Sequence, residues 1–153
     1  METILKEDFY KTLSFISNHI RGKNVEWFVI GKTNLALQGL DLNPSKIGIL
    51  IHSEDLDFFT KIFKDYISSP IIDLTNGEAK EFFMDIFDTK VQVCSEYSNG
   101  TYWEVKKDIV DIQIKNIIIK GFSLESEAQA YAFLGETDTE KQILEYIKTK
   151  KDN

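Results

Sequence analysis

The sequence contains one cysteine, Cys94, and two histidines, His19 and His52, among its 153 residues. One cysteine cannot form an internal disulfide framework, and this favours a reducing compartment. The small number of soft ligands argues against a structural zinc site. No apolar run approaches ~18 residues, and no basic segment followed by an apolar one opens the chain, so neither a membrane span nor secretion is expected. We therefore expect a cytoplasmic protein that does not enter a membrane.

Positive charge is also scarce. Lys and Arg total 18 against 25 Asp and Glu, which gives a net charge of −7, and Arg21 is the only arginine. An acidic chain repels phosphate backbones unless its basic groups are concentrated on one face. Arginine is the usual bidentate clamp for phosphate, and it is nearly absent. A nucleic-acid partner is therefore not expected.

The chain has ample material for a core. Hydrophobic residues make up 42% of it and aromatic residues 12%, and eleven residues are Phe. This composition is typical of ordered globular proteins. The length suits one domain that spans residues 1–153 and needs no disulfide or metal ion to stabilise its core.

The spacing of apolar residues predicts helices and strands in alternation. Helices are expected over 4–20, 33–38, from Ser53 onward, 123–134 and 138–150, the last with Ile143, Leu144 and Ile147 inward. Strands are expected over 25–30, 46–51, 79–87, 90–94 and 116–120. Asp88-Thr89 predicts one tight turn, and Asn99-Gly100 predicts a hairpin turn. The pairs Phe58-Phe59 and Phe82-Phe83 are more typical of core than of stacking platforms. The order indicates a mixed α/β (α+β) fold with a central sheet flanked by helices.

The most informative stretch is Trp27 to Ile51, WFVIGKTNLALQGLDLNPSKIGILI. An apolar run meets Gly31, a short helix and Gly39 follow, and a polar loop leads to a second apolar run over 47–51. This layout resembles the core of the minimal nucleotidyltransferases of the DNA polymerase β-like superfamily. The resemblance extends faintly through Tyr131-Ala132-Phe133-Leu134-Gly135 and covers about residues 25–145. It implies a nucleotidyltransferase-like mixed sheet.

In that family the glycine opens a phosphate-binding helix, and the next strand carries two metal-binding Asp residues one residue apart. A third carboxylate normally comes from a neighbouring strand. Here these positions are Lys46, Gly48 and, in the strand over 90–94, Gln92. Mg²⁺ takes carboxylate oxygens, and a pair of such ions needs several of them. The resemblance therefore implies a degenerate member with no catalytic residues and no bound metal.

Gly31-Lys32-Thr33 is not a P-loop, because Glu26 stands where that motif requires glycine. The resemblance instead lets Gly31 bring backbone amides near a phosphate, with Lys32 as a possible phosphate partner. Thr33 suits a simple helix N-cap. Structural roles for Gly31 and Thr33 are favoured over a retained nucleotide site. A vestigial ligand-binding cleft is then predicted at Gly31, Lys32, Thr33, Lys46, Gly48 and Gln92.

Three functions remain open. The first, which we favour, is a non-catalytic protein that binds a partner or a ligand, such as a nucleotide or anionic small molecule, without a cofactor. The second is an active Mg²⁺-dependent nucleotidyltransferase with displaced carboxylates at Glu81, Asp85 or Glu96. The third is an interaction module, either a homodimer or an antitoxin-like protein partner by analogy. Whether the chain is an enzyme is left undecided, with the balance against it.

Overall fold

The computed structural model describes residues 5–74, 79–97 and 108–151. The elements, in chain order, are α1 (Glu7–Ile20), β1 (Trp27–Ile30), α2 (Gly31–Leu37), β2 (Ile47–His52), α3 (Leu56–Ile62), β3 (Ile72–Leu74), β4 (Ala79–Ile86), β5 (Thr89–Glu96), β6 (Ile109–Ile114), β7 (Ile117–Phe122), α5 (Leu124–Phe133) and α6 (Thr137–Lys151). Short 3-10 turns lie at Ser53–Asp55 and Lys64–Tyr66. Among the described residues, no helix is both long and apolar enough to cross a membrane.

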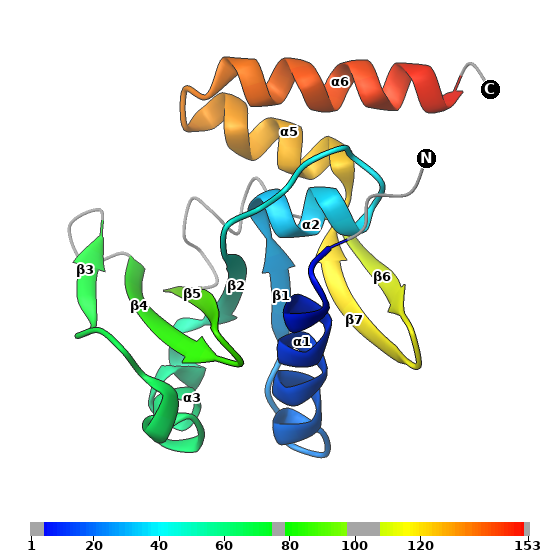
Figure 1. Ribbon diagram of the computed structural model, residues 1–153. Helices are drawn as coiled ribbons and strands as arrows, with labels where there is room; N and C mark the ends of the chain where they lie inside the picture. The colour runs from blue at the N-terminus through cyan, green and yellow to red at the C-terminus, as the bar shows by residue number, and fades with distance from the viewer. Residues whose placement is uncertain (1–4, 75–78, 98–107, 152–153) are drawn as a thin grey trace.

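The described strands form one mixed sheet in the order β3-β4-β5-β2-β1-β7-β6 (Figure 1). β1 is antiparallel to β2 and parallel to β7, and β2 is parallel to β5. Two antiparallel hairpins, β4–β5 and β6–β7, form the two sides. The predicted α/β fold with a central sheet and flanking helices is confirmed.

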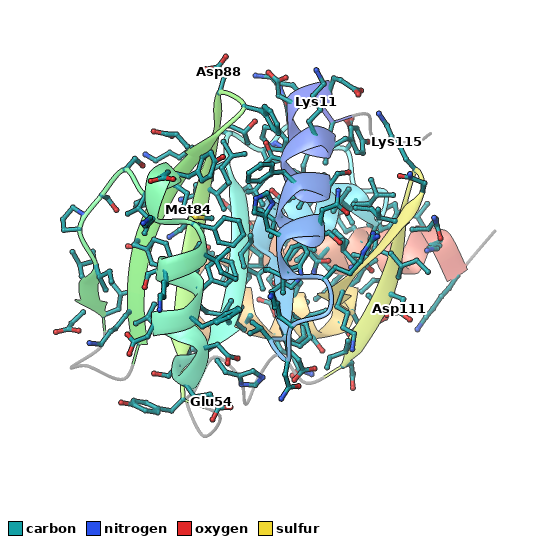
Figure 2. All side chains as sticks on the ribbon, turned by 90° about the horizontal axis from the view of Figure 1, so that it is seen from below. Lys11, Glu54, Met84, Asp88, Asp111 and Lys115 are labelled. Atoms are coloured by element: carbon teal, nitrogen blue, oxygen red, sulfur yellow. The ribbon has the colours of Figure 1, made fainter. Side chains whose placement is uncertain are left out.

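Strand alternation divides the sheet into two faces. Ile47, Ile49 and Ile51 of β2 are fully buried against one face, where α1 and α3 pack (Figures 1 and 2). Helix α1 contributes Phe9, Leu13, Ile16 and Ile20 to the same cluster. Their steps of three and four place them on one side of the helix. Each such side chain contributes about 1.5–3 kcal/mol when it is fully buried, so this cluster is the main source of stability.

A second, smaller core joins α2, α5 and α6, and α6 lies across α5 (Figure 1). Its buried members are Leu35, Leu40, Leu124, Ala128, Tyr131 and Ile143. Phe28, Ile30, Leu50 and Phe122 form a third cluster on the sheet face opposite α1. The predicted inward direction of Leu144 is wrong: its side chain is 49% exposed, whereas Ile143 is buried. Each residue of an α-helix is rotated by about 100° from the one before it, which separates the two.

The tight turn of the β4–β5 hairpin differs by one residue from the prediction. It is formed by Phe87 and Asp88, both at positive φ, and Thr89 already belongs to β5. Thr89 is buried and pairs with Ile86, and a β-branched residue suits that strand position. Figure 2 shows Asp88 and Lys115, at the tips of the two hairpins, on either side of α1.

The sequence pattern did not predict β3 or β6. β3 has only three residues, too few to show an alternation, and β6 follows a segment without a clear pattern. The predicted strand over 116–120 is shifted, because Lys115 at positive φ and Asn116 form the turn before β7. The predicted turn at Asn99-Gly100 lies outside the described residues.

Candidate functional site

The structure brings three of the predicted site residues together. In the parallel pairing of β2 and β5, Gly48 is the direct partner of Gln92. Ile47 and Ile49 point toward α1, so Gly48 faces the other side of the sheet, as does Gln92. Lys46 immediately precedes β2 and follows the same alternation. The sequence reasoning therefore chose neighbouring positions on one face of two adjacent strands.

Gly31 adjoins this face from β1. In the antiparallel pairing of β1 and β2, Ile30 is the partner of Gly48, and Gly31 follows Ile30 at φ +70°. The left-handed backbone at Gly31 turns the chain abruptly from the strand into α2. Lys32 is exposed on the first turn of this helix. Gly31 and Lys32 thus lie at the edge of the site.

Thr33 has a structural role, but it is not the N-cap expected from the sequence. The capping position of α2 is Ile30, and no side chain caps the helix there. The buried Thr33 Oγ1 instead donates to the carbonyl of Lys46 at 2.7 Å. This bond ties α2 to the loop that leads into β2 and fixes the backbone that carries Lys46.

Gly48 lies so close to β1 that the position has no room for a side chain. An ideal Cβ there would be 2.9 Å from the carbonyl oxygen of Ile30 and 3.2 Å from its Cγ1. The nearest atom is backbone, which cannot rotate away as a flexible side chain can. Any residue other than glycine, including aspartate, would require β1 to shift.

A buried carboxylate already occupies the backbone amide at the start of α2. The N–H of Gly31 donates to Glu127 Oε2 at 2.8 Å, and Asn34 Nδ2 donates to the same oxygen at 2.7 Å. Glu127, on α5, is fully buried. Its side-chain oxygen accepts from a backbone N–H that has no partner within the helix. The resemblance expected a phosphate at this amide, and the structure shows the chain's own carboxylate there.

The β4–β5 hairpin extends the site with residues that the sequence reasoning did not place in it. Phe83 of β4 is the partner of Gln92 and is half-buried on the same face. Lys90 Nζ lies 4.5 Å from the centroid of the Phe83 ring, and Lys46 Nζ lies 5.8 Å from it. Gln92 Nε2 donates to Glu81 Oε1 on the same face. One signal was available: Lys90 precedes Gln92 by two residues, so the two must share a face.

Among the described residues, the carboxylates proposed as substitute metal ligands do not form a cluster of three. Glu81 and Asp85 are four residues apart on one strand, which separates their Cα atoms by roughly 13 Å. Glu96 is the partner of Ala79, at the far end of the hairpin from Asp85. In residues 5–74, 79–97 and 108–151, no group of three His, Cys, Asp or Glu side chains could hold a metal ion.

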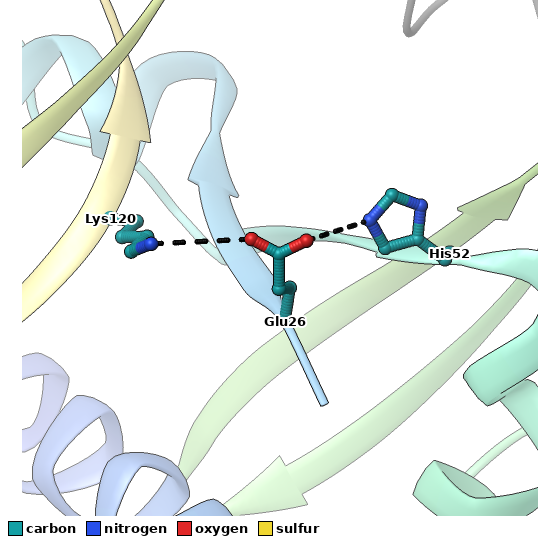
Figure 3. A network of polar contacts seen from close by, with 3 residues as sticks. All are labelled: Glu26, His52 and Lys120. Atoms are coloured by element: carbon teal, nitrogen blue, oxygen red, sulfur yellow. Dashed lines mark hydrogen bonds and ion pairs between the residues drawn. The ribbon is translucent and has the colours of Figure 1, made fainter. Parts of the chain in front are cut away.

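A second polar network lies at the opposite end of β2 (Figure 3). Glu26 contacts His52 Nε2 at 3.3 Å through Oε1 and Lys120 Nζ at 4.0 Å through Oε2. Nearby, partial burial and then the charge of Glu54 raise the pKa of Asp55 above its usual range. A hollow of about 320 Å³ adjoins His52, Ser53, Glu54 and Tyr97, and another of about 350 Å³ follows α1. Neither hollow is lined by the predicted site residues, so strand register, rather than cavity size, locates the candidate site.

Comparison with known proteins bears on the fold. No family model and no curated protein matches this sequence. The crystal structure of a candidate nucleotidyltransferase from Thermotoga maritima matches 95% of this chain and 96% of its own, with a TM-score of 0.73 and 19% sequence identity. At this identity the likeness concerns the fold. The chain therefore has a nucleotidyltransferase-like fold, in which the described residues form a mixed seven-stranded sheet flanked by helices.

Proposed function

We propose that this chain is a non-catalytic protein of nucleotidyltransferase-like fold that binds an anionic small molecule on the face formed by Lys46, Gly48 and Gln92. The observation that carries the proposal is Gly48. Its Cβ position is blocked by the carbonyl of Ile30, at the position where the resemblance requires a metal-binding carboxylate. The loss of that carboxylate is thus built into the approach of two backbones.

The remaining donors do not fit a pair of Mg²⁺ ions. Hard divalent cations require several converging oxygen ligands, preferably carboxylates. Position 46 offers an ammonium group, and position 48 offers no side chain. Position 92 offers an amide whose Nε2 already donates to Glu81. We therefore derive no step that uses a metal, and we assign this face of the sheet to binding.

The test measures metal binding first, because it needs no knowledge of a nucleotide acceptor. Mn²⁺ is titrated into the protein and followed by electron paramagnetic resonance, with and without each nucleoside triphosphate. We expect no Mn²⁺ site of micromolar affinity and no consumption of triphosphate with Mg²⁺ or Mn²⁺. Glu81→Gln is the variant that tests the displaced-carboxylate alternative, because it removes the carboxylate that contacts Gln92. If the wild type binds Mn²⁺ and consumes triphosphate, and the Glu81→Gln variant loses the Mn²⁺ binding, the displaced-carboxylate enzyme would be established instead.

A second candidate, a protein-interaction module, is supported by apolar exposure on the α5–α6 pair. Phe133 is 63% exposed, Leu134 56% and Leu144 49%. Exposed apolar groups of this size are typical of surfaces that bind a second copy or another protein. Light scattering of the purified chain, compared with a Phe133→Ser, Leu144→Ser variant, tests self-association. A mass that is monomeric for both would remove the homodimer.

A further inference from the structure

We infer that Lys46 and Lys90 form a two-cation seat for a di- or polyphosphate group, which they hold without a divalent metal. The inference rests on the proposed binding function and names the class of ligand. It adds a residue, Lys90, that neither the resemblance nor the predicted cleft contains.

Strand register places the two lysines side by side. Gly48 of β2 pairs with Gln92 of β5. Lys46 lies two residues before Gly48, and Lys90 lies two residues before Gln92. Adjacent strands are about 4.8 Å apart, and both side chains leave the sheet on the same face. Both ammonium groups lie within 6 Å of the centroid of the Phe83 ring. A cation at this distance from an aromatic face is attracted to it, so one ring gathers both charges.

Glu81 and Asp85 lie on the same face of the sheet as this pair, but neither carboxylate forms an ion pair with Lys46 or Lys90. Among the described residues, neither Lys46 nor Lys90 forms an ion pair. By contrast Lys80, Lys115 and Lys120 contact carboxylates within 4.0 Å. Asp85 is the register partner of Lys90 but makes no ion pair with it, and Glu81 accepts from Gln92. Like charges on neighbouring strand positions repel, and an anion with more than one charge would relieve that repulsion.

The structure also explains why charge must hold such a ligand. The N–H of Gly31, at the start of α2, is engaged by the buried Glu127 and does not contribute to holding a phosphate. The ligand must therefore be held mainly by the ammonium groups, which act as point charges. The chain carries a net charge of −7, which weakens the approach of any anion. An anion with one charge gains too little from two exposed lysines, whereas adjacent phosphates can contact both.

Calorimetric titration with pyrophosphate and tripolyphosphate in EDTA tests the seat. Orthophosphate, which has a single phosphate group, is the comparison ligand. The variants are Lys46→Ala, Lys90→Ala and the double change, with Lys46→Arg, Lys90→Arg to retain the charge. Lys80→Ala is the matched control, because Lys80 is a partly exposed lysine of the same hairpin that pairs with Asp73. Both site lysines are exposed, so circular dichroism should show an unchanged fold.

We expect pyrophosphate and tripolyphosphate to bind more tightly than orthophosphate, with an affinity that falls as salt increases. Each alanine change should weaken binding at least about tenfold, which corresponds to one lost charge contact. The double change should abolish binding, and the arginine pair and Lys80→Ala should keep it. Equal binding by wild type and the double variant, no binding by wild type, or binding only with Mg²⁺ would overturn the inference.

The outcomes separate this inference from the proposed function. If the wild type binds orthophosphate but not pyrophosphate, the seat is refuted and a binding function survives. If pyrophosphate binding depends on both lysines and Mg²⁺-dependent triphosphate turnover is also found, the non-catalytic proposal fails and the seat remains.

Discussion

Replacing Glu127 with alanine should destabilise the protein strongly, because this carboxylate joins two distant parts of the chain. Its Oε2 accepts from the N–H of Gly31 and from Nδ2 of Asn34, at 2.8 and 2.7 Å. Gly31 begins α2, and Glu127 lies on α5, 96 residues later. The change removes a buried acceptor and leaves two donors, the half-buried Gly31 N–H and the buried Asn34 Nδ2, to find other partners.

The magnitude follows from these contacts. A hydrogen bond to a charged group contributes about 1.5–3 kcal/mol to the free energy of unfolding. Asn34 Nδ2 also donates to the carbonyl of Phe122, so it keeps one partner, whereas the Gly31 N–H loses the contact described here. We therefore expect a loss of about 3–5 kcal/mol. Total stability of a domain is about 5–15 kcal/mol, so the loss is a large fraction of it.

Urea denaturation followed by circular dichroism measures the effect. With a slope of about 1–3 kcal/mol per molar urea, the midpoint should fall by roughly 2 M. Glu127→Gln keeps an acceptor oxygen without the charge and should show about half the loss. Glu125→Ala is the matched control, an exposed glutamate on the same helix, and should stay within about 0.5 kcal/mol of wild type. A Glu127→Ala variant within 1 kcal/mol of wild type would refute the assignment of this carboxylate as the anchor of α2.

Three further changes test other contacts. Gly48→Ala should lower the free energy of unfolding, measured in urea, by about 0.5–2 kcal/mol. The cost of overpacking against Ile30 should exceed the stabilisation that comes from replacing a flexible glycine. A more stable variant would contradict the blocked Cβ position. Leu13→Ala, at a fully buried position of α1, should cost about 2–5 kcal/mol, and Lys11→Ala on the exposed side of the same helix should cost almost nothing. Burial and then the charge of Glu136 raise the pKa of Tyr131 to about 12. The contribution of the neutral phenol to the free energy of unfolding is therefore fully present below pH 10. About 2–3 kcal/mol of it is lost as the pH rises through 12. Tyr131→Phe should remove that part of the alkaline loss, and alkaline titrations that coincide for the two proteins would show that the phenol does not contribute.

The sequence predicted the central part of the fold well because local patterns carry it. The apolar runs around Gly31 and the alternation over 46–51 and 90–94 led to β1, β2 and β5. The same alternation put Lys46 and Gly48 on one face, and the register then paired Gly48 with Gln92. Periodicity of two residues determines the face of a strand wherever the strand itself is recognised.

The contacts that the sequence could not predict are those between segments far apart in the chain. Nothing near Glu127 indicates that it caps Gly31, because the interaction depends on how α5 docks beside α2. The sequence indicated a core position for Phe83 and no role for Lys90, and it is the strand register that places them beside Gln92 and Lys46. Thr33 was expected to cap α2 because caps are local, and its bond to Lys46 again crosses a loop.

The position of β6 at the end of the sheet has a consequence for solubility. Its sequence is IVDIQI, and Asp111 is the one charge within it. The outward face of the β6–β7 hairpin also exposes Ile109 and Ile118, at 48% and 61%. An uncharged apolar edge strand of six residues is a template for cross-β aggregation. Asp111, labelled in Figure 2 and in register with Lys120, therefore acts as a gatekeeper. Asp111→Val should raise light scattering on heating well before the fold itself melts.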